Sequence, residues 1–273
     1  MIELFTEMFS YHFMTRAIIV GLLVSLCAAL LGVPLVLKRY SMIGDGLSHV
    51  GFGALAIAAA VNVAPLALAV PVVIAAAFLL LRINQSSRIK GDAAIALISS
   101  SALAIGVAVV SVTTGMNTDV SNYMFGSILS LSRADAVLSI ALSVIVLLMF
   151  VLLYPRIFAV TFDETFARAT GTKSQLYNTV IAVLTAVTVV IGMRMMGALL
   201  ISSLIIFPAL TAMRLCRSFK SVVVCSSIVS VVCFVLGMTA SYALELPSGA
   251  SVVIVNIIAF LAFSFASLLK RKA

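Results

Sequence analysis

Residues 41–63 combine a membrane-like apolar composition with two side chains that can carry chemistry. Asp45 and His49 are four residues apart, so on a helix they share one face with β-carbons about 5–6 Å apart. A carboxylate at mid-membrane costs about 2.5 kcal/mol or more, and such groups usually face a bundle interior or a pathway. Imidazole and carboxylate together are also ligands for a divalent metal such as zinc. We therefore predict that Asp45 and His49 bind a metal ion.

A structural interpretation of the same two residues is also open. Asp45 lies only about 6 Å beyond Ser41 along a helix, so it could sit at the interface and pair with Lys38 or Arg39. His49, about 12 Å along, would then be a polar packing residue. Small residues fill the rest of this segment and let neighbouring backbones approach closely, which places the helix inside a bundle.

The composition is that of an integral membrane protein. Hydrophobic residues make up 63% of the chain and charged residues 10%, against roughly 45–50% and 25% in soluble domains. The net charge of +8 comes from short basic clusters between apolar segments, a pattern of membrane topology rather than nucleic-acid binding. The four cysteines lack C-x-x-C spacing, which indicates small buried hydrophobes rather than disulfides or a zinc cage.

The apolar runs predict an all-α, polytopic fold with about nine transmembrane helices. Their approximate bounds are 16–37, 41–63, 65–81, 93–113, 136–154, 179–192, 198–213, 221–244 and 250–269. With the N-terminus outside and the C-terminus cytoplasmic, all but Arg16, Arg133 and Arg194 of the 17 basic residues fall on the inner side. This bias fits the positive-inside rule.

Three segments between or before these spans carry further expectations. Residues 1–13 resemble an amphipathic helix lying in the interface. Residues 114–135 are mixed in polarity and suggest an outer loop with a short or re-entrant helix. The longest polar segment, 155–178, is expected to be a cytoplasmic loop.

In that loop, Asp163, Ala167 and Gly171 recur at i, i+4 and i+8. A short helix would gather them on one small-residue face that could dock on a partner. A solvated connecting helix is the alternative. Gly171-Thr172-Lys173-Ser174 resembles part of a P-loop, but it lacks the full spacing and a preceding strand. We therefore expect this chain not to bind ATP and not to be an enzyme.

The seventh predicted span contains Pro208, which removes one backbone hydrogen bond and should bend the helix. Together with Gly197, Ser202 and Ser203, it is predicted to line a pathway or a tight helix contact. Both interpretations stay open, since small residues mark any close helix packing.

Four sequence blocks carry a family resemblance that runs nearly end to end: LGVPLVLKRYSMIGDGLSHVGFGALA, YMFGSILSLS, DETFARATG and VIGMRMMGALLISSLIIFPALTAMRL. In these blocks the chain resembles the permease (membrane) subunits of bacterial zinc/manganese-type metal-uptake ABC transporters. The resemblance implies one transmembrane permease domain over 1–273, working as a homodimer in a bacterial inner or plasma membrane. It also implies a separate ATP-binding cassette subunit, an extracellular metal-binding protein and no permanently bound cofactor.

The resemblance places Asp45 and His49 in the translocation pathway, and Asp163, Ala167 and Gly171 in the helix that contacts the ATPase. The GALLISSLIIFPA block is more similar to the zinc branch, so zinc is the expected cargo, with manganese or iron as alternatives. A secondary cation transporter and an intramembrane enzyme are competing functions. The first lacks visible inverted repeats, and the second lacks another polar cluster within the spans.

Overall fold

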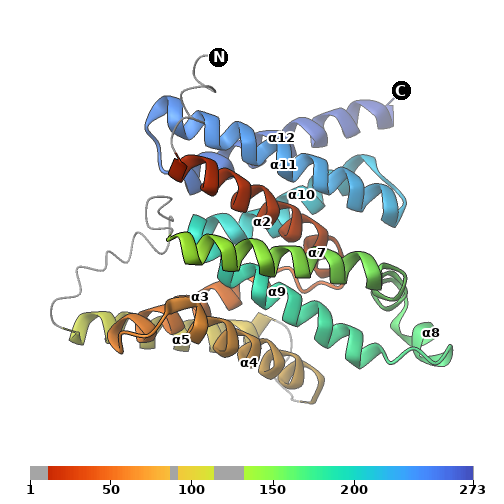
Figure 1. Ribbon diagram of the computed structural model, residues 1–273. Coiled ribbons are helices and arrows are strands. Elements are labelled where there is room, and N and C mark those ends of the chain that lie inside the picture. The colour runs from red at the N-terminus through yellow and green to blue at the C-terminus, as the bar shows by residue number, and fades with distance from the viewer. Residues whose placement is uncertain (1–11, 87–91, 114–131, 273) are drawn as a thin grey trace.

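The computed structural model describes residues 12–86, 92–113 and 132–272, and within these ranges it consists of helices joined by short turns (Figure 1). Its helices are α2 (His12–Leu37), α3 (Ile43–Ala60), α4 (Pro65–Ser86), α5 (Asp92–Val112), α7 (Arg133–Phe162), α8 (Glu164–Ala169), α9 (Ser174–Met196), α10 (Ala198–Leu215), α11 (Phe219–Leu244) and α12 (Ser248–Lys272). Within the described residues, nine of these helices are long and apolar enough to cross a membrane. The predicted all-α, nine-span fold is confirmed.

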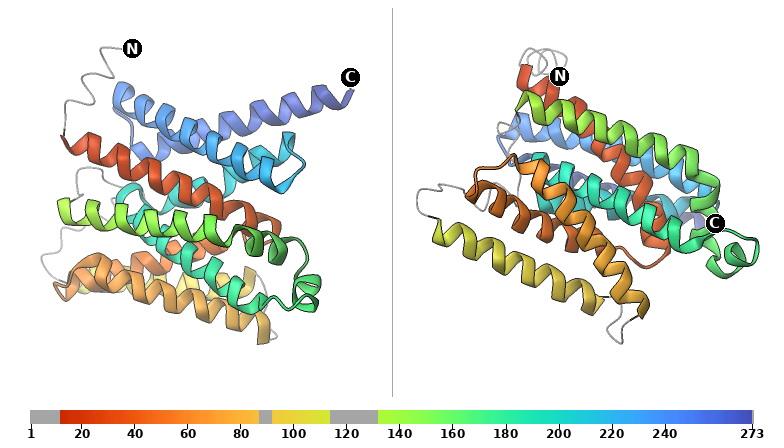
Figure 2. Two further views of the ribbon diagram at one scale, coloured as in Figure 1. Left: turned by 45° about the vertical axis from the view of Figure 1, so that its right-hand side comes forward. Right: turned by 60° about the horizontal axis from the view of Figure 1, so that its bottom comes forward.

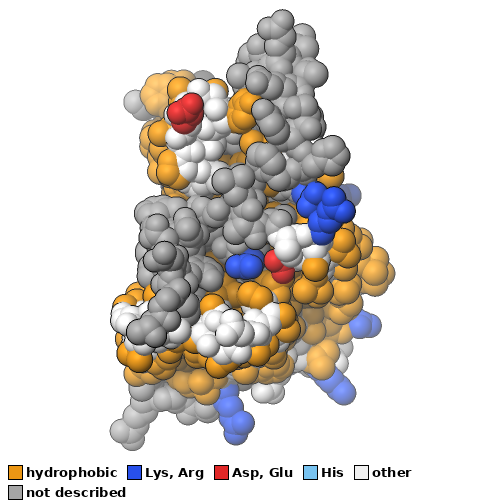
Figure 3. Space-filling view, turned by 60° about the vertical axis from the view of Figure 1, so that its left-hand side comes forward, with side chains coloured by type: hydrophobic (Ala, Val, Ile, Leu, Met, Phe, Trp, Pro, Cys, Tyr) orange, Lys and Arg blue, Asp and Glu red, His pale blue; other side chains and the backbone are white. Residues whose placement is uncertain are grey.

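The helices run roughly alongside one another (Figure 2), and burial separates an inner set from an outer set. In the most apolar window of α9, 78% of residues are buried within the chain, whereas only 11% are buried in that of α12. Helices α2 and α3 belong to the inner set, and α5 and α7 expose much of their apolar surface. In Figure 3, hydrophobic side chains gather over the lower and right-hand parts of the described surface, as a lipid-facing surface requires.

The two described ends of the chain lie at opposite ends of the bundle. In Figure 1, α2 begins at the left and α12 ends at the right, the same side as α8. An odd number of spans requires this arrangement. It places α8 and the basic C-terminal end of α12 on one side, which the positive-inside rule assigns to the cytoplasm.

The predicted loop over 155–178 is wrong in its bounds. Helix α7 continues through Pro155 to Phe162, and α9 already begins at Ser174, so α9 is a full span rather than a short one. The extension of α7 forms because Phe150, Ile157 and Val160 keep a buried apolar face. What remains between the spans is the short helix α8 with its flanking turns.

Two further expectations fall largely outside the described residues. The predicted interfacial helix over 1–13 overlaps the described chain only where α2 begins at His12. The mixed outer segment over 114–135 overlaps it only where Ser132 caps α7, its hydroxyl accepting a 3.0 Å hydrogen bond from the Asp135 amide.

Candidate metal-transport site

Helix α3 carries Asp45 and His49, and its glycines fix its position between α5 and α10. A Cβ at Gly53 would lie 2.7 Å from the carbonyl oxygen of Ala102 on α5, and one at Gly44 would lie 2.8 Å from the Ile205 side chain on α10. These contacts are closer than a larger residue allows, so the small-residue pattern brings both neighbouring helices to the α3 backbone. The predicted inner position of this helix is confirmed.

Asp45 and His49 face each other across one helical turn. His49 Nε2 lies 3.7 Å from Asp45 Oδ2. Two ligand atoms each about 2.1 Å from a tetrahedral ion are roughly 3.4 Å apart, so the pair is spaced nearly as one bound ion would require. The side chains are 44% and 24% exposed for Asp45 and His49, respectively, so neither is sealed in the core. An ion could therefore reach both.

A third polar side chain joins the pair from a distant part of the sequence. Ser202 Oγ on α10 lies 3.2 Å from Asp45 Oδ1 and 3.1 Å from the Ala198 carbonyl oxygen, and its single proton is shared between these two acceptors. The hydroxyl thus fixes one carboxylate oxygen while the other faces His49. The alternative in which Asp45 pairs with Lys38 or Arg39 is not seen: Lys38 contacts Glu164 and Asn178, and within the described residues the ion pair of Asp45 is with His49.

The turn between α9 and α10 places Ser202 at the level of Asp45 within the bundle. Gly197 ends α9 and begins α10 with φ +87°, a conformation that favours glycine. A Cβ at Gly21 of α2 would lie 2.4 Å from the side chain of Met196, the residue just before the turn. Gly21 is roughly 13 Å along α2 from the first residue of that helix. Helix α10 therefore begins within the bundle rather than at its outer edge.

The other two residues singled out in the seventh span have different surroundings. Ser203 is buried, and its hydroxyl is among the buried oxygens without a hydrogen-bond partner in the described chain. Pro208 is buried inside α10. Of the four predicted residues, Ser202 is the one that contacts the Asp45 and His49 pair.

The donor set within one chain is small. In the described part of the chain, no group of three or more His, Cys, Asp or Glu side chains is placed to hold a metal ion. Asp45 and His49 supply two ligand atoms, and Ser202 supplies a nearby hydroxyl oxygen. A complete coordination shell therefore needs water, backbone oxygens or a second copy of the chain.

Helix α8 does not gather its three predicted docking residues on one exposed face. Asp163 is the N-cap, its side chain accepting a 2.9 Å hydrogen bond from the Phe166 amide. Ala167 is 1% exposed and packs inward against Val160 and Tyr177. Gly171 is exposed after the helix, with φ +83°. On the outer surface of α8 the exposed side chain is instead that of Phe166, which is 65% exposed.

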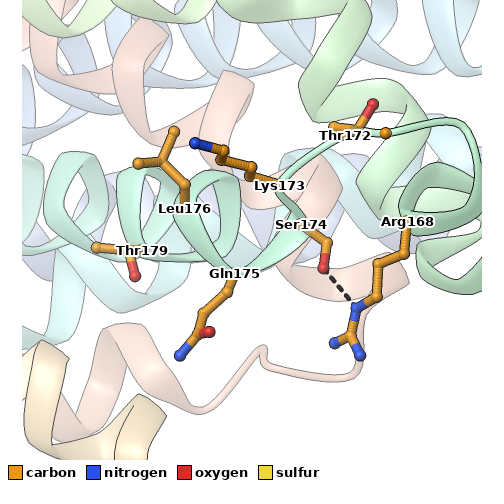
Figure 4. Close-up of a pocket in the computed structure, with 8 residues that line it drawn as sticks. Arg168, Thr172, Lys173, Ser174, Gln175, Leu176 and Thr179 are labelled. Carbon is orange, nitrogen blue, oxygen red and sulfur yellow. Dashed lines mark hydrogen bonds between the residues drawn. The ribbon is translucent and has the colours of Figure 1, made fainter.

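A shallow cavity of about 780 Å³ lies where α8 meets α9. Figure 4 shows Arg168 of α8 reaching across to the start of α9, where its Nε donates a 2.7 Å hydrogen bond to Ser174 Oγ. Lys173 and Gln175 also line the cavity. This polar hollow and the exposed Phe166 form the cytoplasmic surface next to α8.

A family model described as the ABC 3 transport family matches residues 10–267 of the chain. The chain belongs to the ABC 3 transport family. The manganese import system permease protein ScaB of Streptococcus gordonii is 29% identical to this permease, covering 99% of this chain and 98% of its own. The manganese transport system membrane protein MntC of Listeria monocytogenes is 30% identical, with 96% and 94% covered.

Solved structures agree with this assignment. PsaBC from Streptococcus pneumoniae, determined in complex with a Fab, matches with a TM-score of 0.86 and 29% identity, covering 96% of this chain and 95% of that chain. A metal-chelate type ABC transporter in an inward-facing conformation shares the fold, with a TM-score of 0.74 at 16% identity. The resemblance predicted from the sequence is confirmed, and the protein is a multi-pass membrane permease.

Proposed function

We propose that this permease moves a divalent transition metal inward across the membrane, driven by ATP hydrolysis on a separate subunit. The observation that carries the proposal is the Asp45 and His49 pair, 3.7 Å apart on an inner helix and still partly exposed. Ionisable groups placed inside a membrane bundle mark ion pathways. Both ligand types bind divalent transition metals.

Manganese is the favoured cargo. Two of the relatives described above are named as manganese permeases, which supports the alternative rather than the zinc expected from the sequence. The local chemistry agrees, because the carboxylate of Asp45 and the hydroxyl of Ser202 are oxygen donors near one imidazole. Oxygen ligands suit manganese, but imidazole and carboxylate also bind zinc, so the choice of manganese rests on the relatives.

Two arrangements can complete the coordination shell. If the permease is a homodimer with α3 near its twofold axis, two copies would supply two carboxylates and two imidazoles. Otherwise water and backbone oxygens would complete a site within each copy. In both arrangements the site is weak, because an importer must release the ion that it binds.

The ATP-binding subunit is proposed to dock around α8 on the cytoplasmic side. Phe166 is exposed beside the hollow lined by Arg168 and Lys173, and an exposed aromatic next to polar groups is typical of an interface anchor. Ala167 would contribute by packing α8 onto the bundle, and Asp163 by capping it. An extracellular metal-binding protein is proposed to deliver the ion at the opposite end.

Uptake of ⁵⁴Mn²⁺ by proteoliposomes holding the assembled transporter tests the cargo and the site together. His49→Ala removes one of two protein ligands and Asp45→Asn removes the negative charge of the other, so each should reduce uptake at least tenfold. Asp92→Asn is the carboxylate-to-amide control, since Asp92 is an exposed carboxylate in the first turn of α5. Uptake near wild type in both site variants would overturn the assignment, and uptake of Zn²⁺ but not Mn²⁺ would restore zinc.

Phe166→Asp tests the docking surface separately. It should abolish copurification of the ATP-binding subunit while leaving the permease in the membrane. Gly171 is a poorer probe, because any side chain at φ +83° strains the backbone. Normal copurification by Phe166→Asp would show that α8 does not anchor the ATPase.

A further inference from the structure

A polar cluster at the cytoplasmic end joins α8 to the end of α2. Lys38 follows α2, and its side chain is only 11% exposed. Its ammonium lies 3.5 Å from Glu164 Oε2 and donates a hydrogen bond to Asn178 Oδ1. Asn178 Nδ2 in turn donates a 3.2 Å hydrogen bond to the same Glu164 oxygen. Lys38, Glu164 and Asn178, which we call the Lys38 cluster, thus form a closed triangle between three helices.

The second oxygen of Glu164 is held within the α8–α9 corner. Arg168 donates a 2.5 Å hydrogen bond and Ser174 a 3.3 Å hydrogen bond to Glu164 Oε1. Arg168 also bonds Ser174. Glu164 therefore contacts Arg168 and Ser174 in the α8–α9 corner through Oε1, and Lys38 at the end of α2 through Oε2.

The pKa of Glu164 and that of Lys38 both lie below their usual values, so the ionised form of Glu164 is favoured and the charged form of Lys38 is disfavoured. Burial works to raise the pKa of Glu164, but hydrogen bonds from Arg168 and Asn178 and the charge of Lys38 outweigh it, so the pKa lies below its usual value. Burial lowers the pKa of Lys38, and the charge of Glu164 opposes that effect. A buried ammonium needs a partner, so Lys38 stays attached to α8 through Glu164.

The segment after Lys38 is short and tightly folded, and it leads directly to the metal ligands. The Tyr40 amide donates a 2.8 Å hydrogen bond to the Leu35 carbonyl oxygen, and the Ile43 amide donates one of 3.0 Å to Tyr40. Helix α3 begins at Ile43, and Asp45 lies in its first turn. Helix α8 itself packs on α7 and α9, so the Lys38 cluster is its side-chain link toward α3.

We propose that the Lys38 cluster transmits movement of α8 to α3 and so couples the ATPase to the Asp45 and His49 site. The proposal rests on the proposed function, because it takes α8 as the docking element. Lys38 and Glu164 are positioning residues: they contact no metal. When the ATPase moves α8, the ammonium of Lys38 follows Glu164, and the tight turn carries that displacement to the start of α3.

Three variants of the assembled transporter test the link: Glu164→Gln, Lys38→Met and the double variant. Glutamine keeps an acceptor for Arg168 and Ser174 but removes the charge that holds Lys38. Each variant should still copurify with the ATPase and hydrolyse ATP. The number of Mn²⁺ ions transported per ATP should fall at least about fivefold, the lower end of coupling between distant sites. Asp92→Asn serves as the carboxylate-to-amide control on the same side.

The double variant separates coupling from simple destabilisation. If both residues act through one link, losing both should reduce the ratio no further than losing one. Independent effects would multiply in the double variant, and that result would overturn the proposal. An unchanged ratio in both single variants would also overturn it. Absence of Mn²⁺ uptake by the wild-type transporter would instead refute the proposed function.

Hydrogen exchange on the wild-type transporter tests the proposal without relying on a variant that must insert correctly into the membrane. Adding ATP with vanadate to the assembled transporter should change exchange in residues 38–45 together with residues 164–170. A change in 164–170 without a change in 38–45 would show that α8 moves independently of the α2–α3 turn and would overturn the proposal.

Discussion

Gly32→Ala should disrupt the site without altering any ligand. A Cβ at Gly32 on α2 would lie 2.0 Å from the carbonyl oxygen of Ile205 on α10, whereas ordinary contact begins at 3.4 Å. The helices must therefore separate by about 1.4 Å, because a backbone oxygen cannot rotate away as a side-chain end can. Ile205 lies about one turn beyond Ser202, whose hydrogen bond to Asp45 is already 3.2 Å long. A shift of α10 away from α3 by that amount would lengthen the bond beyond hydrogen-bonding distance.

The energetic cost follows from two opposing terms. Overpacking costs about 1–3 kcal/mol, and contact with backbone puts this site near the upper end. Alanine gains about 1 kcal/mol over glycine in a helix interior. The net destabilisation is therefore about 2 kcal/mol.

Thermal unfolding in detergent and ⁵⁴Mn²⁺ uptake by the assembled transporter measure the two effects. Gly51→Ala is the matched control, because its Cβ would meet the flexible end of Met193 at 3.0 Å. We expect Gly32→Ala to unfold at lower temperature and to lose most uptake, and Gly51→Ala to resemble wild type. Equal stability and uptake in the two variants would refute the role assigned to the α2–α10 contact.

Other predictions address single contacts. Ser202→Ala removes the hydrogen bond to Asp45, worth about 1 kcal/mol, and should reduce Mn²⁺ uptake roughly fivefold. Ser203→Ala deletes a buried hydroxyl without a partner in the described chain, so thermal unfolding should show unchanged or higher stability. Arg194→Ala leaves Asp135, 3.6 Å away and partly buried, without its cation, and should destabilise more than the double variant Arg194→Ala/Asp135→Ala. Because the pKa of Glu164 is lowered, its contribution to stability is present above the unfolded-state pKa and lost as pH falls through the folded value. The Glu164→Gln difference in unfolding temperature should therefore be constant from pH 6 to 8 and shrink in acid.

Sequence predicts the spans because each apolar run is long enough to cross a bilayer, and this signal is local. The prediction over 155–178 is wrong in its bounds because polar residues and Pro155 there are typical of the end of a helix. The buried positions Ile157 and Val160 continue the inner face of α7, and proline is tolerated where neighbouring groups satisfy the freed backbone. In that segment, the helical spacing of the buried residues indicates the observed helix better than the average polarity does.

The site was predictable to the extent that it is local. Asp45 and His49 are one turn apart, so spacing alone places them together. Ser202 lies 157 residues from Asp45, and Lys38 lies 126 residues from Glu164, so no periodicity connects them. Similarly, the spacing of Ala167 indicated a helical face but not its direction, which packing against Tyr177 decides.

The small ligand set is itself informative about transport. A structural metal site closes its shell with four protein ligands and holds its ion, whereas this chain offers two candidate ligand atoms, and the Ser202 hydroxyl bonds the other oxygen of the Asp45 carboxylate. Binding then depends on whether Ser202 keeps Asp45 turned toward His49, and Ser202 reaches Asp45 from α10 rather than from α3. A shift of α3 against α10 would weaken the site without removing a ligand. Since the Lys38 cluster leads to the start of α3, the same displacement that couples the ATPase would also release the ion.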